Sequence, residues 1–128
     1  MKDIDILIVD DSPAFNHLTK LTLGKVGVKG SITELSNGQK ALHYLEDNAN
    51  CPDVILLDIN MPVMDGFDFL EEYKAGHRCL DKTIIYMLTS SAQEVDKIKA
   101  NAFGIVKDYF EKPLTEENVH QIMADISR

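Results

Sequence analysis

Short apolar segments alternate with helix-forming segments along the whole chain, and this alternation restricts the fold more than any other feature. Five segments have the length and apolar character of strands: Ile4–Val9, Gly30–Leu35, Val54–Leu57, Thr83–Leu88 and Ile105–Tyr109. A helix-start signal or helical periodicity follows each of them. Alternating strands and helices predict a parallel sheet covered by helices on both faces. We therefore expect a doubly wound, five-stranded α/β fold, whose strand order the pattern alone does not reveal.

Residues that favour helix N-termini follow the predicted strands. Ser12 and Pro13 are typical of an N-cap with proline in the first turn, and they predict a helix to about Gly24. Further helix starts are expected at Asn37, Asp65, Ser91 and Thr115. Ser91 and Glu94 have the spacing of a capping box, in which each side chain satisfies a backbone N–H group at the helix start.

Length and charge restrict the class of protein. With 128 residues the chain can form one hydrophobic core, so we expect a single domain over residues 1–128. The formal net charge of −8 argues against direct contact with nucleic acid, because phosphates are bound by clustered Lys and Arg. No apolar run approaches the roughly 20 residues of a membrane helix, and the N-terminal segment lacks a signal-peptide cleavage site. We expect a cytoplasmic protein without a membrane partner.

The two cysteines, Cys51 and Cys79, lie far apart in the sequence and form neither a CxxC motif nor a zinc-site spacing. The sequence leaves a disulfide between them open. We favour two reduced thiols, because disulfides are rare in the cytoplasm.

Polar residues collect where the predicted strands end. Asp10 and Asp11 follow the first strand, Asp58 the third, Thr89 and Ser90 the fourth, and Lys112 and Pro113 come soon after the fifth. In an open parallel sheet the carboxyl ends of the strands form the binding edge, so these residues should converge. Taken alone, Asp11 and Thr89 are common helix caps and a lone lysine is usually exposed. Their coincidence at one edge favours a shared site.

Three carboxylates at one edge repel one another unless a cation lies among them. Mg²⁺ suits such a site, because it binds carboxylate oxygens and leaves coordination positions for phosphate. A carboxylate is also a nucleophile towards phosphorus and gives an aspartyl phosphate. The Lys112 ammonium and the Thr89 hydroxyl would stabilise the charge on the phosphoryl group. The residues by themselves therefore predict a Mg²⁺-dependent phosphoryl site.

With these residues the chain resembles the receiver domains of two-component response regulators, the CheY-like family, over essentially its whole length. The resemblance rests on Asp10-Asp11 after ILIV, Asp58 within LLDINMPVMDG, Thr89-Ser90 after YML and Lys112-Pro113 after DYFE. It implies a flavodoxin-like sheet with strand order 2-1-3-4-5. It also implies that Asp58 accepts a phosphoryl group from a histidine kinase or a phosphotransfer protein.

The resemblance further implies a role for each remaining site residue. The implied Mg²⁺ ligands are Asp10, Asp11, Asp58 and the main-chain carbonyl of Asn60. Thr89 would bind a phosphoryl oxygen, the small Ser90 would leave access to the aspartate, and Lys112 would pair with the phosphate. The Lys112–Pro113 bond is implied to be cis. Tyr109 matches the aromatic residue that swings inward when Thr89 is drawn to the phosphate, and Asn60 and Ser91 occupy positions that tune self-dephosphorylation.

The protein is then expected to be a signalling switch that catalyses only its own phosphorylation and slow self-dephosphorylation. Its downstream protein target would bind the surface of the fourth helix, the fifth strand and the last helix. The last helix runs close to Arg128, so we expect either a stand-alone receiver or part of a longer regulator.

Two alternatives stand beside this interpretation. One is a Mg²⁺-dependent phosphohydrolase with an aspartyl-phosphate intermediate, although such enzymes often carry a second acid where this chain has Asn60. The other is a receiver that has lost phosphorylation and serves only as a binding module. The presence of every site residue argues against that alternative.

Overall fold

The computed structural model describes residues 3–47 and 51–127. The strands in this part of the chain are β1 (Ile6–Val9), β2 (Ile32–Leu35), β3 (Val54–Leu57), β4 (Ile84–Thr89) and β5 (Val106–Glu111). The helices are α1 (Pro13–Val26), α2 (Gly38–Asp47), α3 (Gly66–Lys74), α4 (Glu94–Ala102) and α5 (Glu116–Ile126). None of these helices is long and apolar enough to cross a membrane. The predicted alternation of strands and helices is confirmed.

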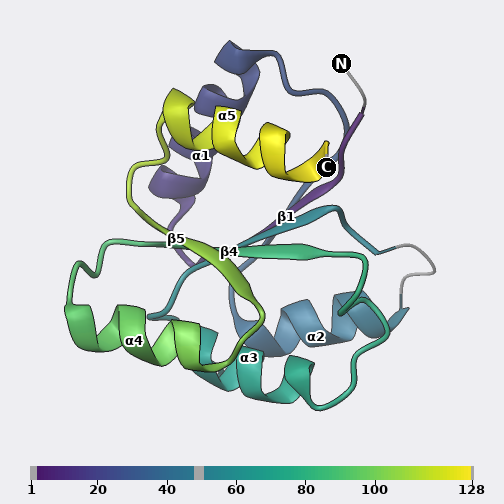
Figure 1. The fold of residues 1–128 in the computed structure, drawn as a ribbon. Coiled ribbons are helices and arrows are strands. Elements are labelled where there is room, and N and C mark those ends of the chain that lie inside the picture. Colours follow the sequence, from purple (N-terminus) through teal and green to yellow (C-terminus); the bar gives the residue numbers. More distant parts are fainter. Residues whose placement is uncertain (1–2, 48–50, 128) are drawn as a thin grey trace.

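The strands form one parallel sheet in the order β2-β1-β3-β4-β5. Figure 1 shows α1 and α5 on one face of this sheet and α2, α3 and α4 on the other. Such a covered parallel sheet is the doubly wound arrangement. The predicted fold class is therefore confirmed, together with the strand order that the family resemblance implies.

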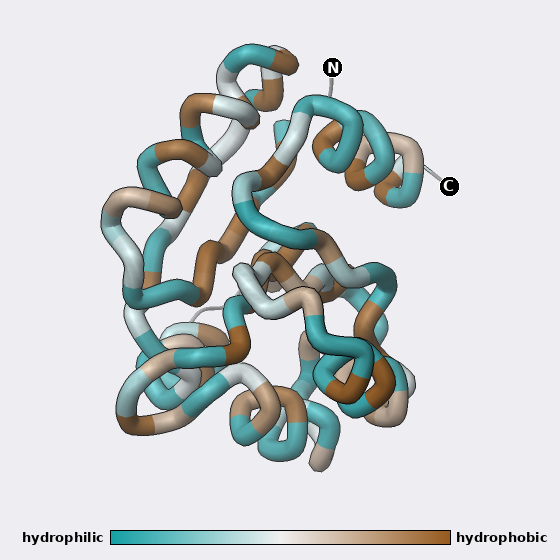
Figure 2. The backbone as a smooth tube through the Cα atoms, turned by 90° about the vertical axis from the view of Figure 1, so that its left-hand side faces the viewer, coloured by the Kyte–Doolittle hydropathy of each residue, from teal (hydrophilic) through white to brown (hydrophobic). Residues whose placement is uncertain are grey.

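The centre of the sheet explains why two of its strands are so apolar. Every residue of β1 and β3 is buried, because these strands lie mid-sheet with helices on both sides. Successive side chains of β3 alternate between the two cores, with Ile55 and Leu57 on the α2/α3 side and Val54 and Leu56 on the α1/α5 side. In Figure 2 hydrophobic and hydrophilic residues alternate along the helices, as expected when a helix buries one side.

Helix caps follow the sequence signals at four of the five helices. Ser12 Oγ accepts from the Phe15 backbone N–H at 3.3 Å, and Pro13 is the first residue of α1. Asp65 and Thr115 cap α3 and α5, and Asn37 Oδ1 accepts from the Lys40 N–H at the start of α2.

The capping box predicted at Ser91 is wrong. The residue before α4 is Gln93, whose side chain makes no capping hydrogen bond. Ser91 lies outside the helix, and its hydroxyl donates instead to Asp96 Oδ2 at 2.5 Å. Ser91 therefore pairs with Asp96 of α4 and not with Glu94, the acid of the predicted box.

The expectation of two reduced thiols is also wrong, because Cys51 and Cys79 form a disulfide. The fold brings the segment before β3 against the loop between α3 and β4, with the two Cα atoms 5.5 Å apart. That separation lies in the range a disulfide requires. Spacing along the chain could not reveal it, since 28 residues separate the cysteines.

Candidate functional site

The carboxyl ends of β1 and β3 place Asp10 and Asp58 side by side. Val9 is paired with Leu57 in the strand register, and the Asp58 backbone N–H donates to the Val9 carbonyl at 2.9 Å. Each aspartate is thus the first residue beyond a fully buried strand. Parallel strands end at the same edge, so the two carboxylates meet there.

Asp10, Asp11 and Asp58 form a cluster of possible metal ligands. One carboxylate oxygen from each lies within 4.8 Å of the others. Asp10 and Asp58 are 4% and 6% exposed, whereas Asp11 is on the surface. Ligands that are all oxygen, on a site with one exposed side, suit a hard divalent cation that keeps bound water. The donor set therefore fits Mg²⁺.

Lys112 places a positive charge against two of these carboxylates. Its Nζ lies 2.7 Å from Asp10 Oδ2 and 2.9 Å from Asp58 Oδ2, and its side chain is 5% exposed. Burial by itself would lower the pKa of the ammonium, but the hydrogen bonds to Asp10 and Asp58 together outweigh it, and the pKa is raised. Lys112 is therefore held as a cation between two buried acids.

Asp10 is fixed by its neighbours in the first turn of α1. Its Oδ1 accepts from the Ser12 N–H at 2.9 Å, and its main-chain carbonyl accepts from Asn16 Nδ2 at 3.2 Å. Burial raises the pKa of the Asp10 carboxyl, and the hydrogen bonds from Lys112 and Ser12 oppose that rise. Sequence reasoning assigned no role to Asn16, which reads as one more polar residue of a helix.

Lys112 directly follows β5, and its backbone is hydrogen-bonded to the neighbouring strand β4. Its N–H donates to the Thr89 carbonyl at 2.9 Å, and the Lys112–Pro113 peptide bond is cis, as the family resemblance implies. The Phe15 ring centroid lies 4.6 Å from the ammonium, within the range of a cation–π contact. Sequence reasoning missed Phe15, because an aromatic in the first turn of a helix reads as a core residue.

The chain between β3 and α3 passes very close to Asp58. The Gly66 N–H donates to the Ile59 carbonyl at 2.8 Å, and a Cβ atom on Gly66 would lie 2.2 Å from the Asp58 carbonyl oxygen. Only glycine fits such an approach. Asn60, in the same loop, is exposed.

Thr89 and Tyr109 are linked through the segment at Ser91. Thr89 is fully buried, and its Oγ1 accepts from the Ser91 N–H at 3.4 Å. The Tyr109 hydroxyl donates to the Ser91 carbonyl at 2.9 Å, while Ser90 between them is exposed. Burial raises the pKa of Tyr109, so its phenol remains a donor near neutral pH. One short segment therefore contacts both residues.

Comparison with known proteins shows the family to which the chain belongs. A family model described as response regulator receiver domain matches residues 6–124. The chain is 36% identical over 129 residues to transcriptional regulatory protein MalR of Bacillus subtilis, covering 98% of this chain and 51% of MalR. It is 33% identical over 112 residues to chemotaxis protein CheY1 of Helicobacter pylori, covering 88% of this chain and 87% of CheY1. The chain thus spans about half the length of MalR and most of CheY1.

Solved structures with the same fold include response regulators. A two-component response regulator from Cytophaga hutchinsonii has a TM-score of 0.91 at 27% identity, with 98% of both chains covered. The phosphorylated cyanobacterial phytochrome response regulator RcpA has a TM-score of 0.78 at 28% identity, covering 98% of this chain and 92% of RcpA.

Fold and site together define a parallel α/β domain with an acidic, lysine-paired site at the carboxyl edge of its sheet. The chain belongs to the family of response regulator receiver domains. It is a receiver of two-component signalling, homologous to CheY1 and MalR, and the family implies phosphorylation on an aspartate.

Proposed function

We propose that this chain controls a protein partner through phosphorylation of Asp58. The observation that carries the proposal is the buried contact of the Lys112 ammonium with both Asp10 and Asp58. An Asp58 carboxylate oxygen attacks the phosphorus of a phosphohistidine, and the P–N bond breaks. The released imidazole keeps the bonding electrons and takes up a proton. Lys112 is then placed to pair with the phosphoryl group.

Asp10, Asp11 and Asp58 would hold Mg²⁺, with the main-chain carbonyl of Asn60 as a further ligand. The bound ion would neutralise charge on the phosphoryl oxygens. The chain itself orients the two buried carboxylates: Asp58 Oδ1 accepts from the Ile59 N–H at 2.7 Å, and Asp10 Oδ1 accepts from the Ser12 N–H. The cluster of carboxylate oxygens within 4.8 Å supports this assignment.

Thr89 and Tyr109 would be the moving parts of the switch. In our proposal the Thr89 hydroxyl donates to a phosphoryl oxygen once Asp58 is phosphorylated. The hydrogen bonds of Ser91 with Thr89 and Tyr109 support a coupled displacement of all three. Phosphorylation would then shift an equilibrium between two conformations that exist before it.

The remaining residues would control access to Asp58 and the lifetime of its phosphorylated form. Ser90 is small and exposed, and would leave the approach to Asp58 open. Pro113 would support Lys112 by restricting the backbone that follows it. Self-dephosphorylation would be slow, and the groups at Asn60 and Ser91 would set its rate. The protein would act as a switch and not as an enzyme on other substrates.

We propose a histidine kinase or a phosphotransfer protein as donor, and a downstream protein as target of the α4/β5/α5 face. On α4, Val95 and Ile98 are 63% and 64% exposed, which suits a protein contact. The Lys97 ammonium of the same helix lies 5.8 Å from the Tyr109 ring centroid. A movement of Tyr109 would therefore change a contact on this face. The net charge of −8 opposes direct nucleic-acid contact, and we place the protein in the cytoplasm.

Phosphorylation by a small donor tests the proposal. The protein is incubated with Mg²⁺ and acetyl phosphate, and its intact mass is measured. We expect one phosphoryl adduct in the wild type and none in Asp58→Asn, while Asp81→Asn, in an exposed loop, keeps the adduct. An adduct that persists in Asp58→Asn refutes the assignment. Rapid turnover of unrelated phosphate esters would favour the phosphohydrolase instead.

A further inference from the structure

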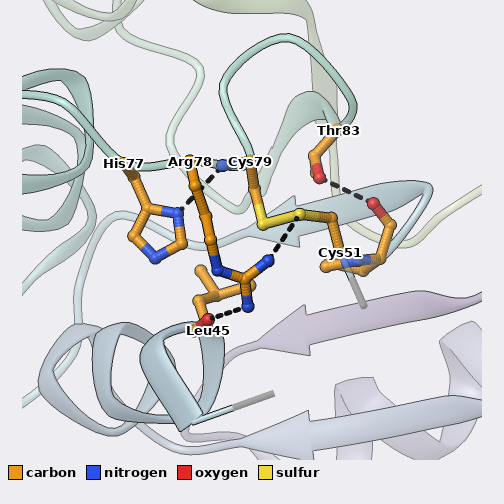
Figure 3. Close-up of a disulfide and its surroundings, with 7 residues drawn as sticks. Leu45, Cys51, His77, Arg78, Cys79 and Thr83 are labelled. Atoms are coloured by element: carbon orange, nitrogen blue, oxygen red, sulfur yellow. Dashed lines mark hydrogen bonds between the residues drawn. A yellow bond between two sulfur atoms is a disulfide. The ribbon is translucent and has the colours of Figure 1, made fainter. Parts of the chain in front are cut away.

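Figure 3 shows the Cys51–Cys79 disulfide and its surroundings. Cys51 comes shortly before the start of β3, whereas Asp58 follows the end of that strand, so the disulfide and Asp58 lie at opposite ends of β3. Cys51 precedes β3, and Cys79 belongs to the loop between α3 and β4. We propose that this pair is a reversible redox site which reacts with dithiol reductants and is separate from the phosphoryl site. This step rests on the cytoplasmic location proposed above: disulfides there are usually transient or redox-sensing, so the bridge is expected to open and close.

The two sulfur atoms are not equally accessible. Cys79 is completely buried, whereas Cys51 is only partly buried against the core. An incoming thiolate must approach one sulfur directly, so its attack is restricted to Cys51. Cys79 is then the leaving group, and the mixed disulfide forms on Cys51.

Arg78 supplies a positive charge beside the attacked sulfur. Its Nη1 donates to Cys51 Sγ at 3.4 Å, and its Nη2 donates to the Leu45 carbonyl of α2 at 2.9 Å. Figure 3 shows the guanidinium lying between the disulfide and that carbonyl. A nearby cation favours the thiolate over the thiol. After reduction, the guanidinium is therefore expected to lower the pKa of the Cys51 thiol and so to raise the fraction of thiolate, the form that closes a disulfide again.

Reduction by a dithiol balances as two exchange steps. A reductant thiolate forms a bond to Cys51 Sγ, the S–S bond breaks, and Cys79 leaves as a thiolate that takes up a proton. The second reductant thiolate then attacks the mixed disulfide and releases Cys51. Two electrons and two protons pass from the dithiol to the cysteines, and the reductant becomes its own disulfide.

Contacts other than the bridge keep the two segments together. The Thr83 hydroxyl donates to the Pro52 carbonyl at 2.6 Å, next to Cys51. Within the second segment, the Cys79 N–H donates to His77 Nδ1 at 3.2 Å and the His77 ring stacks on Tyr73 of α3 with centroids 5.0 Å apart, which holds the Cys79 loop against its own helix. These contacts do not need the S–S bond. The reduced sulfurs should therefore stay close enough to pair again.

The redox step can be tested on the intact protein. The chain is equilibrated with glutathione buffers of stepped ratio, quenched, alkylated in denaturant and weighed by intact mass. We expect a form with two alkyl adducts under reducing conditions and a form with none under oxidising conditions, interconverting in both directions. Two adducts at every ratio, or a bridge that excess dithiothreitol leaves intact in the folded protein, would overturn the proposal. Asp58→Asn should behave like the wild type, which separates this result from the fate of the phosphorylation proposal.

The role of Arg78 needs a second measurement. In Cys79→Ser, the pH dependence of alkylation reports the pKa of the Cys51 thiol. We expect it below the ordinary value of about 8.5, and raised by about one unit when Arg78→Gln is added. Lys25→Gln, in the last turn of α1 on the opposite face of the sheet, serves as the charge control and should not move it. An equal pKa with and without Arg78 would remove the arginine from the proposal.

Discussion

The Lys112 ammonium lies 2.9 Å from the Asp58 carboxylate, although the two residues are 54 positions apart in the chain. Both side chains are less than a tenth exposed, at 5% and 7%. Placing paired charges in a protein interior adds little net stability, but removing one partner leaves the other uncompensated. We therefore interpret this contact as one that positions the Lys112 charge at the phosphoryl site, and not as one that mainly stabilises the fold.

Replacing Lys112 with Ala leaves Asp10 and Asp58 buried without their cation. We expect the metal-free variant to lose about 3–5 kcal/mol of unfolding free energy, the range for a broken buried pair. Mg²⁺ should restore more stability in the variant than in the wild type, because it replaces the lost charge. Urea unfolding with and without Mg²⁺ measures both effects. Lys107→Ala, at an exposed position of β5, should change stability by no more than about 0.5 kcal/mol. Equal losses in the two variants would contradict the prediction.

Much of the fold was predictable from hydrophobic pattern and helix caps. Val54–Leu57 has the predicted bounds, because an uninterrupted apolar run between polar residues marks a buried strand clearly. The end of β5 was not predicted. The strand continues past Tyr109 through Phe110 to the exposed Glu111, and a polar residue such as Glu111 gives no sign of a strand in the sequence. The strand order came only from the family resemblance, because periodicity does not say which strands are neighbours.

The site was predictable as far as topology alone determines it. Parallel strands end at one edge, so the approach of Asp10, Asp58 and Lys112 followed from their places in the chain. The contacts of Phe15 with Lys112 and of Ser91 with Tyr109 were not foreseen. They depend on how helices and loops pack after the sheet has formed, and no local pattern encodes that packing.

Mg²⁺ binding should depend on Asp11 more strongly than stability does. Asp11 is exposed, so Asp11→Asn should change the metal-free unfolding free energy by no more than about 0.5 kcal/mol. The same substitution should weaken Mg²⁺ binding by at least about tenfold. Losing a residue that only hydrogen-bonds a metal ligand already costs about that much affinity, and Asp11 would be a ligand itself. Isothermal titration calorimetry measures the affinity, with Asp81→Asn as the control. An unchanged Kd in Asp11→Asn would exclude that carboxylate from the metal site.

Gly66→Ala should disturb the site through its backbone. A Cβ at this position would lie 2.2 Å from the Asp58 carbonyl oxygen, so the loop or the end of β3 must shift. We expect a loss of about 1–3 kcal/mol in unfolding free energy and a slower reaction with acetyl phosphate. Gly24→Ala provides a matched control in α1, because a Cβ there meets no atom within 4 Å. It should stabilise the protein by about 0.5–1 kcal/mol. Equal effects of the two substitutions would show that crowding at Asp58 is not the cause.

Tyr86 should make the protein less stable at alkaline pH. It is fully buried, and its hydroxyl donates to Asp125 Oδ2 at 2.6 Å. Burial raises the pKa of Tyr86, and the bond to Asp125 raises it further. As the pH rises, the phenol of Tyr86 therefore loses its proton in the unfolded chain first, at a pKa of about 10. The contribution of the protonated Tyr86 to the free energy of unfolding is complete below pH 10 and is lost as the pH rises above it.

Comparing the wild type with Tyr86→Phe isolates this effect. Unfolding free energy is measured by urea titration between about pH 8 and pH 11, and the wild type should fall more steeply above pH 10. Below pH 10 the variant should be less stable by about 1 kcal/mol, the usual contribution of one hydrogen bond. Parallel curves for the two proteins would show that Tyr86 does not titrate as described.

Reduction of the Cys51–Cys79 bridge should lower stability without abolishing phosphorylation. The bridge closes a 28-residue loop, and chain entropy predicts a loss of about 3–4 kcal/mol when it opens. Urea unfolding with and without dithiothreitol measures the loss, and Cys51→Ser/Cys79→Ser should not respond to the reductant. The Thr83–Pro52 hydrogen bond does not need the bridge, so the start of β3 should hold its position and Asp58 at its other end should still react. A reduced chain that no longer accepts a phosphoryl group would show instead that the two ends of β3 are coupled.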